Sequence, residues 1–213
     1  MKIDIKKLED EQIKLSKLVD KNDYTDFSQI QNACGIAEII NEKYKEILVG
    51  MVTIDINKNE IEKKWHKDKI NFPYIHGFRA YREINALVKC YEKLEIKPDI
   101  FFIKANGICH PRKFGLACHF GLVTDSCVVG ISDELLKLEK LEIVNDYIKI
   151  DNEIVGKFLK TVEFANPIIV SIGNKISIES ALEITKRFCF NKYKYPYPLI
   201  AAKKFIRKIA KEL

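Results

Sequence analysis

The pattern of hydrophobic and polar positions along the chain predicts a helix followed by a group of short strands. Residues 2–21 carry apolar side chains at the spacing of an amphipathic helix, separated by charged ones. Between residues 32 and 65 the pattern changes to short β-prone runs separated by polar turns, which predicts an antiparallel meander of three strands. We expect these strands at residues 33–40, 47–56 and 61–65.

The rest of the chain alternates between helical spacing and short apolar runs. The expected helices are 79–94, 112–122 and 177–189, and the expected strands are 97–104, 126–131 and 167–172, with a hairpin over 141–162. This order predicts an α/β fold with a mixed central sheet that begins with the three-stranded antiparallel meander and is flanked by helices. No repeat, linker or low-complexity tract divides the chain, so we expect a single domain over residues 1–213.

Composition places the chain among ordinary globular proteins. Its 213 residues are 31% charged and 47% hydrophobic, which is enough apolar material for one domain. Apolar stretches such as residues 47–54 are far shorter than the roughly 18 residues of a membrane span, so we expect no membrane partner. The charged N-terminus lacks the apolar segment of a signal peptide, and six cysteines without a C-x-x-C pair indicate free thiols in a reducing compartment. We therefore expect a cytoplasmic monomer.

The net charge changes the picture only a little. A formal charge of +6 suits a polyanionic partner such as nucleic acid. Most of the 36 basic residues are lysine, in a sequence that is also rich in isoleucine and asparagine, a bias that base composition alone can produce. Charge therefore leaves nucleic-acid binding open.

Two segments are unusually dense in glycine, proline, histidine and aromatic residues. They are Phe72–Glu83, with the sequence FPYIHGFRAYRE, and Gly107–Gly121, with the sequence GICHPRKFGLACHFG. Both resemble signature blocks of the endonuclease V family, which read roughly P-Y-I-P-G-x-x-x-x-R-E and D-G-x-G-x-x-H-P-R-x-x-G-x-A-S-H-x-G. Weaker similarity defines a family-like core at 31–198, between an N-terminal helical segment at 1–30 and a C-terminal helix at 199–213.

The resemblance implies an RNase H-like fold and a metal-dependent hydrolase of DNA repair, which recognises a deaminated purine such as inosine in DNA or RNA and cuts the backbone nearby. A loop of the family acts as a wedge in the duplex while the altered base is flipped into a pocket, because a base cannot be inspected on its pairing edge inside the stack. The residues that match the wedge are Pro73, Tyr74, Ile75 and His76. His76 departs from the family's proline, so the loop loses some rigidity.

The resemblance also suggests roles for two glycines and for the His-Pro-Arg turn. Gly77 and Gly107 would bring backbone against the base, while Arg112 would meet a phosphate. His110 is a retained residue of the second block and a candidate for catalysis. Each position also has a structural interpretation: tight packing for the glycines, a surface charge for Arg112 and a core aromatic for Tyr74.

The family's chemistry depends on carboxylates that hold Mg²⁺, which aligns the attacking water and neutralises charge on the phosphate. The first carboxylate, on the first strand, matches Glu38 by its distance from Tyr74, although a gap of a few residues would place Cys34 there instead. The second matches Glu83. Two carboxylates of the expected set are therefore candidates in this chain.

The third carboxylate position carries a cation. Lys104 stands where the family has the aspartate that opens its second block, and Asp133 stands where the family has a lysine that approaches the phosphate. Asn174 replaces a histidine that the resemblance places near the metal site. An ammonium group repels a divalent ion, so the resemblance to an Mg²⁺ enzyme is in doubt at this point and the metal ligands are unknown. The exchange of Lys and Asp predicts a Lys104–Asp133 ion pair.

Three hypotheses follow, and they leave open whether the chain is an enzyme. In the first, the chain binds inosine-containing nucleic acid through the wedge and pocket, and Mg²⁺-dependent cleavage is reduced or lost. In the second, it is a divergent endonuclease V that still cuts near inosine, with Glu38 and Glu83 holding one Mg²⁺. The third is new chemistry such as a base-excising lyase, in which burial lowers the pKa of Lys104 and makes it a nucleophile. Cys109, beside His110, is a further candidate nucleophile.

Overall fold

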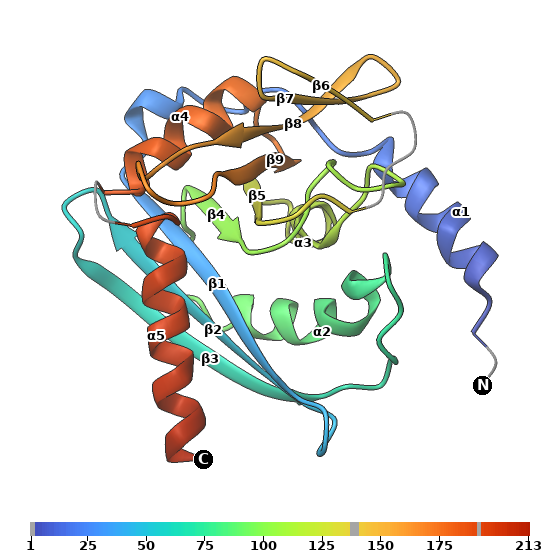
Figure 1. Ribbon diagram of the computed structural model, residues 1–213. Helices are drawn as coiled ribbons and strands as arrows, with labels where there is room; N and C mark the ends of the chain where they lie inside the picture. The colour runs from blue at the N-terminus through green and yellow to red at the C-terminus, as the bar shows by residue number, and fades with distance from the viewer. Residues whose placement is uncertain (1–2, 137–140, 191–192) are drawn as a thin grey trace.

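A mixed sheet of nine strands runs through the part of the chain that the computed structural model describes, residues 3–136, 141–190 and 193–213 (Figure 1). The strands are β1 (Asn32–Asn41), β2 (Glu46–Asp55), β3 (Glu60–Lys69), β4 (Ile100–Ile103), β5 (Val128–Ser132), β6 (Leu141–Val144), β7 (Tyr147–Ile150), β8 (Glu153–Leu159) and β9 (Ile168–Asn174). They lie in the order β3-β2-β1-β4-β5-β9-β8-β7-β6. The predicted α/β class is confirmed, as is the antiparallel meander that begins the mixed sheet.

Strands β1, β4 and β5 run parallel to one another, so their carboxyl ends meet at one edge of the sheet. The register pairs Ile36 on β1 with Ile103, the last residue of β4. Glu38 near the end of β1, Lys104 directly after β4 and Asp133 directly after β5 therefore reach the same edge. The topology brings together residues that are far apart in the sequence.

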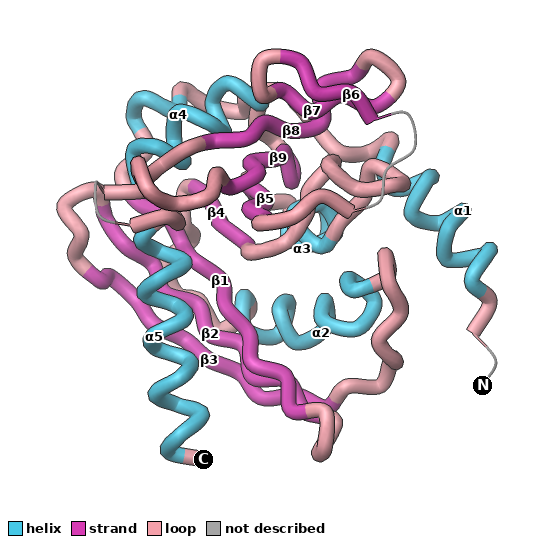
Figure 2. The backbone as a smooth tube through the Cα atoms, in the orientation of Figure 1, coloured by secondary structure: helices cyan, strands magenta, loops and turns pink. Residues whose placement is uncertain are grey.

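Five α-helices and one short 3-10 helix flank the sheet in the described residues. They are α1 (Ile5–Ser16), η1 (Phe27–Gln29), α2 (Arg79–Tyr91), α3 (Leu116–Thr124), α4 (Ile178–Phe188) and α5 (Tyr197–Glu212). Helix α2 packs on one face of the meander and α5 packs on the other (Figure 2). Helix α1 docks on the loops that precede α2 and α3.

Two segments differ from the expected pattern. The helix expected from residue 112 begins at Leu116, because the residues before it form a turn, in which the N–H of Lys113 bonds to the carbonyl of His110 and that of Gly115 bonds to the carbonyl of Gly107. The hairpin expected over 141–162 consists of three strands, β6, β7 and β8. Their connections, Asn145–Asp146 and Asp151–Asn152, have positive φ at both residues, which is the conformation of a two-residue hairpin turn and one that Asn and Asp adopt readily.

The structure also bears on two expectations from composition, which concern the cysteines and membrane-spanning helices. All six cysteines belong to the described segments, and all are buried free thiols, as predicted. None of the described helices is long and apolar enough to cross a membrane.

Candidate functional site

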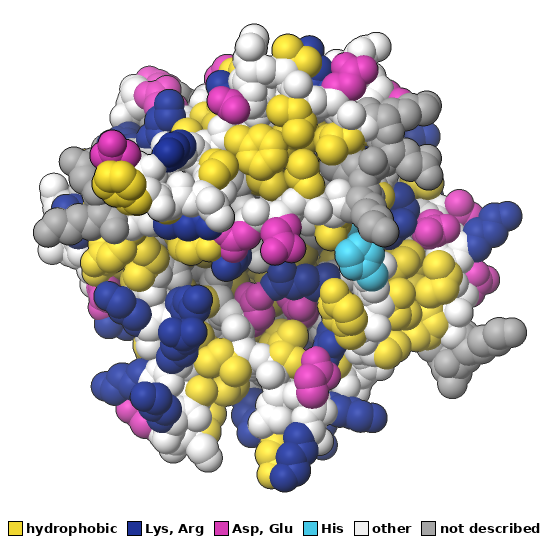
Figure 3. All heavy atoms as spheres, in the orientation of Figure 1, with side chains coloured by type: hydrophobic (Ala, Val, Ile, Leu, Met, Phe, Trp, Pro, Cys, Tyr) yellow, Lys and Arg dark blue, Asp and Glu magenta, His cyan; other side chains and the backbone are white. Residues whose placement is uncertain are grey.

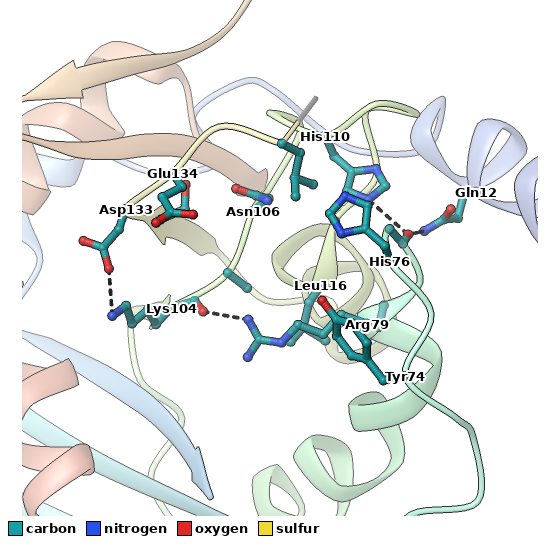
Figure 4. Close-up of a pocket in the computed structure, with 16 residues that line it drawn as sticks. Gln12, Tyr74, His76, Arg79, Lys104, Asn106, His110, Leu116, Asp133 and Glu134 are labelled. Atoms are coloured by element: carbon teal, nitrogen blue, oxygen red, sulfur yellow. Dashed lines mark hydrogen bonds and ion pairs between the residues drawn. The ribbon is translucent and has the colours of Figure 1, made fainter. Parts of the chain in front are cut away.

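A cavity of about 350 Å³ opens where the loop before α2 faces the ends of β4 and β5. Ligand pockets in proteins span about 300–1,000 Å³, so this cavity lies at the lower end of that range. Six of the predicted site residues line it: Tyr74, His76, Gly77, Lys104, His110 and Asp133 (Figure 4). Glu38, Glu83 and Arg112 lie beside the cavity, and each is bonded to a residue of its lining.

The loop of residues 73–77 presents its side chains to solvent. Tyr74 is 67% exposed, and Pro73 and His76 are exposed as well, whereas Ile75 is half-buried. The alternative interpretation of Tyr74 as a core aromatic is therefore wrong. An exposed aromatic side chain at the rim of a cavity is available to a ligand.

The end of this loop is fixed by three hydrogen bonds to one carbonyl group. Gly77 has a φ of +79°, a left-handed conformation that favours glycine. Its carbonyl oxygen accepts hydrogen bonds from His110 Nε2 at 3.1 Å, Arg112 Nη2 at 2.9 Å and Gln12 Nε2 at 3.2 Å. Sequence reasoning missed Gln12, because α1 lies outside both signature blocks and nothing in its pattern marks a buried glutamine.

His110 holds the loop as a neutral ring. Burial, together with the positive charge of Arg112, lowers the pKa of His110 to about 4. The neutral imidazole donates from Nε2 to the Gly77 carbonyl, and Nδ1 accepts the backbone N–H of Arg112 at 3.3 Å. Because both ring nitrogens are engaged, His110 positions the loop in this structure and has no nitrogen free for proton transfer.

Arg112 was expected to meet phosphate, but its guanidinium is engaged within the protein. Nη1 pairs with Glu9 at 3.3 Å, Nε donates to Gln12, and Nη2 donates to Gly77. The guanidinium also lies over the ring of Phe78, 4.4 Å from its centroid. In this structure Arg112 ties the loop to α1, and the expected phosphate contact remains a prediction.

Arg79 joins the two predicted carboxylates. Its Nε donates to both oxygens of Glu83, at 2.9 and 2.8 Å, its Nη2 binds Glu38, and its Nη1 donates to the Lys104 carbonyl at 3.0 Å. Glu38 therefore shares a partner with Glu83, whereas the alternative residue Cys34 is fully buried in the apolar cluster under α2. Burial raises the pKa of Glu83 to about 7, against the opposing charge of Arg79. Sequence reasoning missed Arg79, because it falls on an unspecified position of the first block.

The predicted Lys104–Asp133 ion pair is present, with Nζ and a carboxylate oxygen 2.8 Å apart. Asp133 also accepts a hydrogen bond from the Tyr195 hydroxyl at 2.6 Å and pairs with Lys194 at 2.8 Å. Burial raises the pKa of Asp133, but the hydrogen bonds from Lys104, Lys194 and Tyr195 outweigh it and hold the pKa well below its usual value.

The two nucleophiles considered for new chemistry are both held in unreactive forms. Burial lowers the pKa of Lys104, but its hydrogen bonds to Asp133 and Tyr195 outweigh this effect, so that the pKa is raised. The lowered pKa expected of a nucleophilic Lys104 is therefore wrong. Burial raises the pKa of the Cys109 thiol to about 12, so little thiolate is present near neutral pH.

These residues do not fit a divalent metal ion. Glu38 and Glu83 bind the guanidinium of Arg79, and the third position of the expected set carries the ammonium of Lys104. In the space-filling view, acidic and basic side chains lie next to one another in the middle of this face (Figure 3). Within residues 3–136, 141–190 and 193–213, no group of three His, Cys, Asp or Glu side chains is arranged to hold a metal.

Asn174 and Gly107 belong neither to the lining of the cavity nor to the loop of residues 73–77. Strand β9 is antiparallel to β5, so that Asn174 pairs with Val128, at the end of the sheet opposite Asp133. The buried side chain of Asn174 bonds to three backbone groups, and the expectation that it lies near the metal site is wrong. Gly107 is buried against β9, where a Cβ atom would lie 1.9 Å from the carbonyl oxygen of Ile172. The packing interpretation therefore accounts for Gly107.

The two signature blocks thus lie around one cavity. Comparison with known proteins shows which family the chain belongs to. A family model for endonuclease V matches residues 13–204. The chain belongs to the endonuclease V family. Endonuclease V of Dictyoglomus thermophilum is 36% identical over 164 residues, which cover 74% of this chain and 72% of that protein. Endonuclease V of Dictyoglomus turgidum is 32% identical over 207 residues, which cover 87% of this chain and 90% of that protein.

Solved endonuclease V structures have the same fold. The Bacillus subtilis protein superposes with a TM-score of 0.90 at 26% identity and covers 99% of this chain and 93% of its own. The Ciona intestinalis protein, in complex with a 24mer DNA that contains an inosine followed by a ribo-adenosine, superposes with a TM-score of 0.87 at 22% identity, covering 98% of each chain. The RNase H-like fold expected from the resemblance is confirmed.

Proposed function

We propose that this member of the endonuclease V family binds nucleic acid that carries a deaminated purine such as inosine, and that its Mg²⁺-dependent cleavage is reduced or lost. One observation carries the proposal: the same cavity has an exposed aromatic side chain at its rim and internally paired charges on its opposite side. Tyr74 stands at the rim, whereas Arg79 and Lys104 lie where the nuclease chemistry of the family would need carboxylates free for a metal.

Tyr74 has the placement that a wedge requires. Its side chain points away from the core, while the backbone of its loop is held at the Gly77 carbonyl. A loop that is already ordered loses less conformational entropy when it binds. An aromatic ring that replaces a flipped base in the stack contributes about 1–3 kcal/mol.

The cavity beside the loop offers partners for a flipped base. Asn106 Oδ1 and Ser132 Oγ belong to lining residues, are buried, and have no hydrogen-bond partner in the described structure. An unsatisfied buried polar atom costs about 1–3 kcal/mol, and the polar edge of a base carries groups that can satisfy such atoms. Inosine-containing DNA, the ligand in the Ciona structure, is the class of ligand that we propose here.

A second candidate function is a divergent nuclease. Glu38 and Glu83 converge on a single group, which favours a site that could hold one ion if Arg79 moved aside. In that case Mg²⁺ would compete with the guanidinium for the same two carboxylates. Incision is the property that separates this candidate from the first.

An inosine-containing duplex and its adenine-containing counterpart test both functions. We expect fluorescence anisotropy in EDTA to show preferential binding to the inosine duplex, weakened roughly 5- to 150-fold by Tyr74→Ala. Tyr44→Ala is the matched control, because Tyr44 is 61% exposed in the turn between β1 and β2, and it should leave binding unchanged. Robust incision in Mg²⁺ would establish the second candidate, and equal binding of the two duplexes would contradict both.

A further inference from the structure

Arg79 makes an unusual set of contacts for an arginine at the start of a helix. It is the first residue of α2, and its guanidinium reaches β1 through Glu38, the next turn of its own helix through Glu83, and the end of β4 through the Lys104 carbonyl. Glu83 is only 2% exposed and Glu38 only 14%. One cation therefore sits between two largely buried carboxylates and three structural elements.

The carboxylates need such a cation. Two like charges that converge in a poorly solvated site repel each other strongly, and either one would be costly to leave unpaired. A pair of converging carboxylates is also the arrangement that attracts a divalent ion. The planar guanidinium binds Glu83 with Nε and Glu38 with Nη2, so one of the two negative charges is offset by a side chain of the chain itself.

Lys104 adds a second positive charge to the same site. Its ammonium group pairs with Asp133, and its backbone carbonyl accepts the hydrogen bond from Arg79 (Figure 4). The guanidinium and the ammonium together carry the charge of one divalent ion, and they face the three carboxylates of Glu38, Glu83 and Asp133. Both are covalently part of the protein, so neither depends on the concentration of metal in solution.

We propose that Arg79, assisted by Lys104, is a resident cation that replaces the divalent metal ion in this chain. Folding and nucleic-acid binding are then independent of Mg²⁺ and Mn²⁺. Only the statement about nucleic-acid binding rests on the proposed function. The statement about folding is tested on the protein alone, so its failure is distinguishable from failure of the proposed function.

Thermal unfolding of the full-length protein in EDTA and in MnCl₂ tests the proposal. We expect the same Tm for the native chain in both solutions. Arg79→Met leaves Glu38 and Glu83 without a cation, so the Tm in EDTA should fall by about 10 °C, and Mn²⁺ should recover at least half of that loss. The double variant Arg79→Met, Lys104→Asp adds a carboxylate at position 104 to those of Glu38, Glu83 and Asp133, and calorimetric titration should show Mn²⁺ binding at least tenfold tighter than in Arg79→Met.

Arg82→Met is the matched control. Arg82 lies on the same helix, is buried, and donates its described hydrogen bonds to Glu42 at 2.7 Å, so that only its charge acts on Glu83. Its loss should destabilise the protein without producing a Mn²⁺ response. An equal Mn²⁺ response in Arg79→Met and Arg82→Met would overturn the proposal.

A second variant keeps the test decisive if Arg79→Met fails to fold. Lys104→Asp alters a partly exposed side chain and leaves Arg79 in place, so this variant should fold and show no Mn²⁺ binding by calorimetry. Mn²⁺ binding that Glu83→Gln abolishes, whether in Lys104→Asp or in the native chain, would show that the guanidinium yields to metal and that the resident-cation assignment is wrong.

Discussion

The cavity has two walls that use their hydrogen bonds differently. The loop wall comprises residues 73–77 with Gln12, His110 and Arg112, and the charge wall comprises Glu38, Arg79, Glu83, Lys104 and Asp133. In the loop wall the polar side chains bond mainly to backbone, at the Gly77 carbonyl, and the tip of the loop remains exposed. In the charge wall the polar side chains bond mainly to one another.

Under the proposed function, the difference assigns recognition to the loop wall and the reduced cutting to the charge wall. Hydrogen bonds to backbone fix the shape of the loop wall without involving the side chains of Tyr74 or His76, which remain exposed to solvent. Ion pairs between side chains fix the charge wall by satisfying the groups that a metal or a phosphate would otherwise engage. The proposed function therefore requires that recognition and cutting be separable within one fold.

The largest loss in the free energy of unfolding is expected for a substitution in the turn that joins the two walls. Gly107 lies between Lys104 of the charge wall and His110 of the loop wall, and a Cβ there would meet the backbone of β9. Gly107→Ala should reduce the free energy of unfolding in urea by about 3 kcal/mol or more, because backbone cannot move aside as a side chain can. Gly77→Ala, which strains only the loop wall, should cost about 1 kcal/mol. Similar costs at the two positions would contradict this division.

Much of this architecture could be predicted from the sequence, because periodicity reports which residues face a core. The antiparallel meander and the buried strand before Lys104 follow from apolar patterning. The Lys104–Asp133 pair follows from comparing the chain with the family's signature at two positions. Neither inference needs three-dimensional contacts.

The rest depended on contacts that no local pattern reports. Arg79 and Glu83 are spaced as a helical i, i+4 pair, but the contact of Arg79 with Glu38 depends on how β1 packs against α2. Gln12 reaches Gly77 across 65 positions of sequence. Asn174 was misplaced because sequence alone does not show which end of an antiparallel strand lies at the site.

Acid should weaken the loop wall before it weakens the exposed part of the charge wall. The pKa of His110 is lowered from 6.5 to about 4 in the folded protein, so the unfolded chain binds more protons between these values and stability falls as the pH drops from 6.5 to 4. The loss due to this residue is about 3 kcal/mol. It is measured as the difference between the native chain and His110→Gln in urea unfolding at several pH values. A parallel pH dependence of the two proteins would contradict a neutral, buried His110.

A smaller effect is expected when the tie between the loop and α1 is weakened. Arg112→Lys keeps the charge but cannot satisfy Gly77, Gln12 and Glu9 together. We expect a loss of about 2 kcal/mol in the free energy of unfolding, since a buried polar group is left unsatisfied, and weaker binding to inosine duplex. Arg187→Lys, on α4 and away from the cavity, is the control. Full stability in Arg112→Lys would show that the loop wall does not need its guanidinium.

The smallest effect is expected at the exposed end of the charge wall, where a double-mutant cycle gives the sharpest comparison. Lys104 and Asp133 are 44% and 32% exposed, so solvent screens their attraction, and Lys194 remains beside Asp133 when Lys104 is removed. A cycle of Lys104→Met, Asp133→Asn and the double variant should give a coupling energy below about 1 kcal/mol, reduced further by salt. The Lys208–Glu212 pair, which is more exposed still, should give a coupling near zero. A coupling of several kcal/mol at Lys104 and Asp133 would mean that this pair, rather than Arg79, holds the charge wall together.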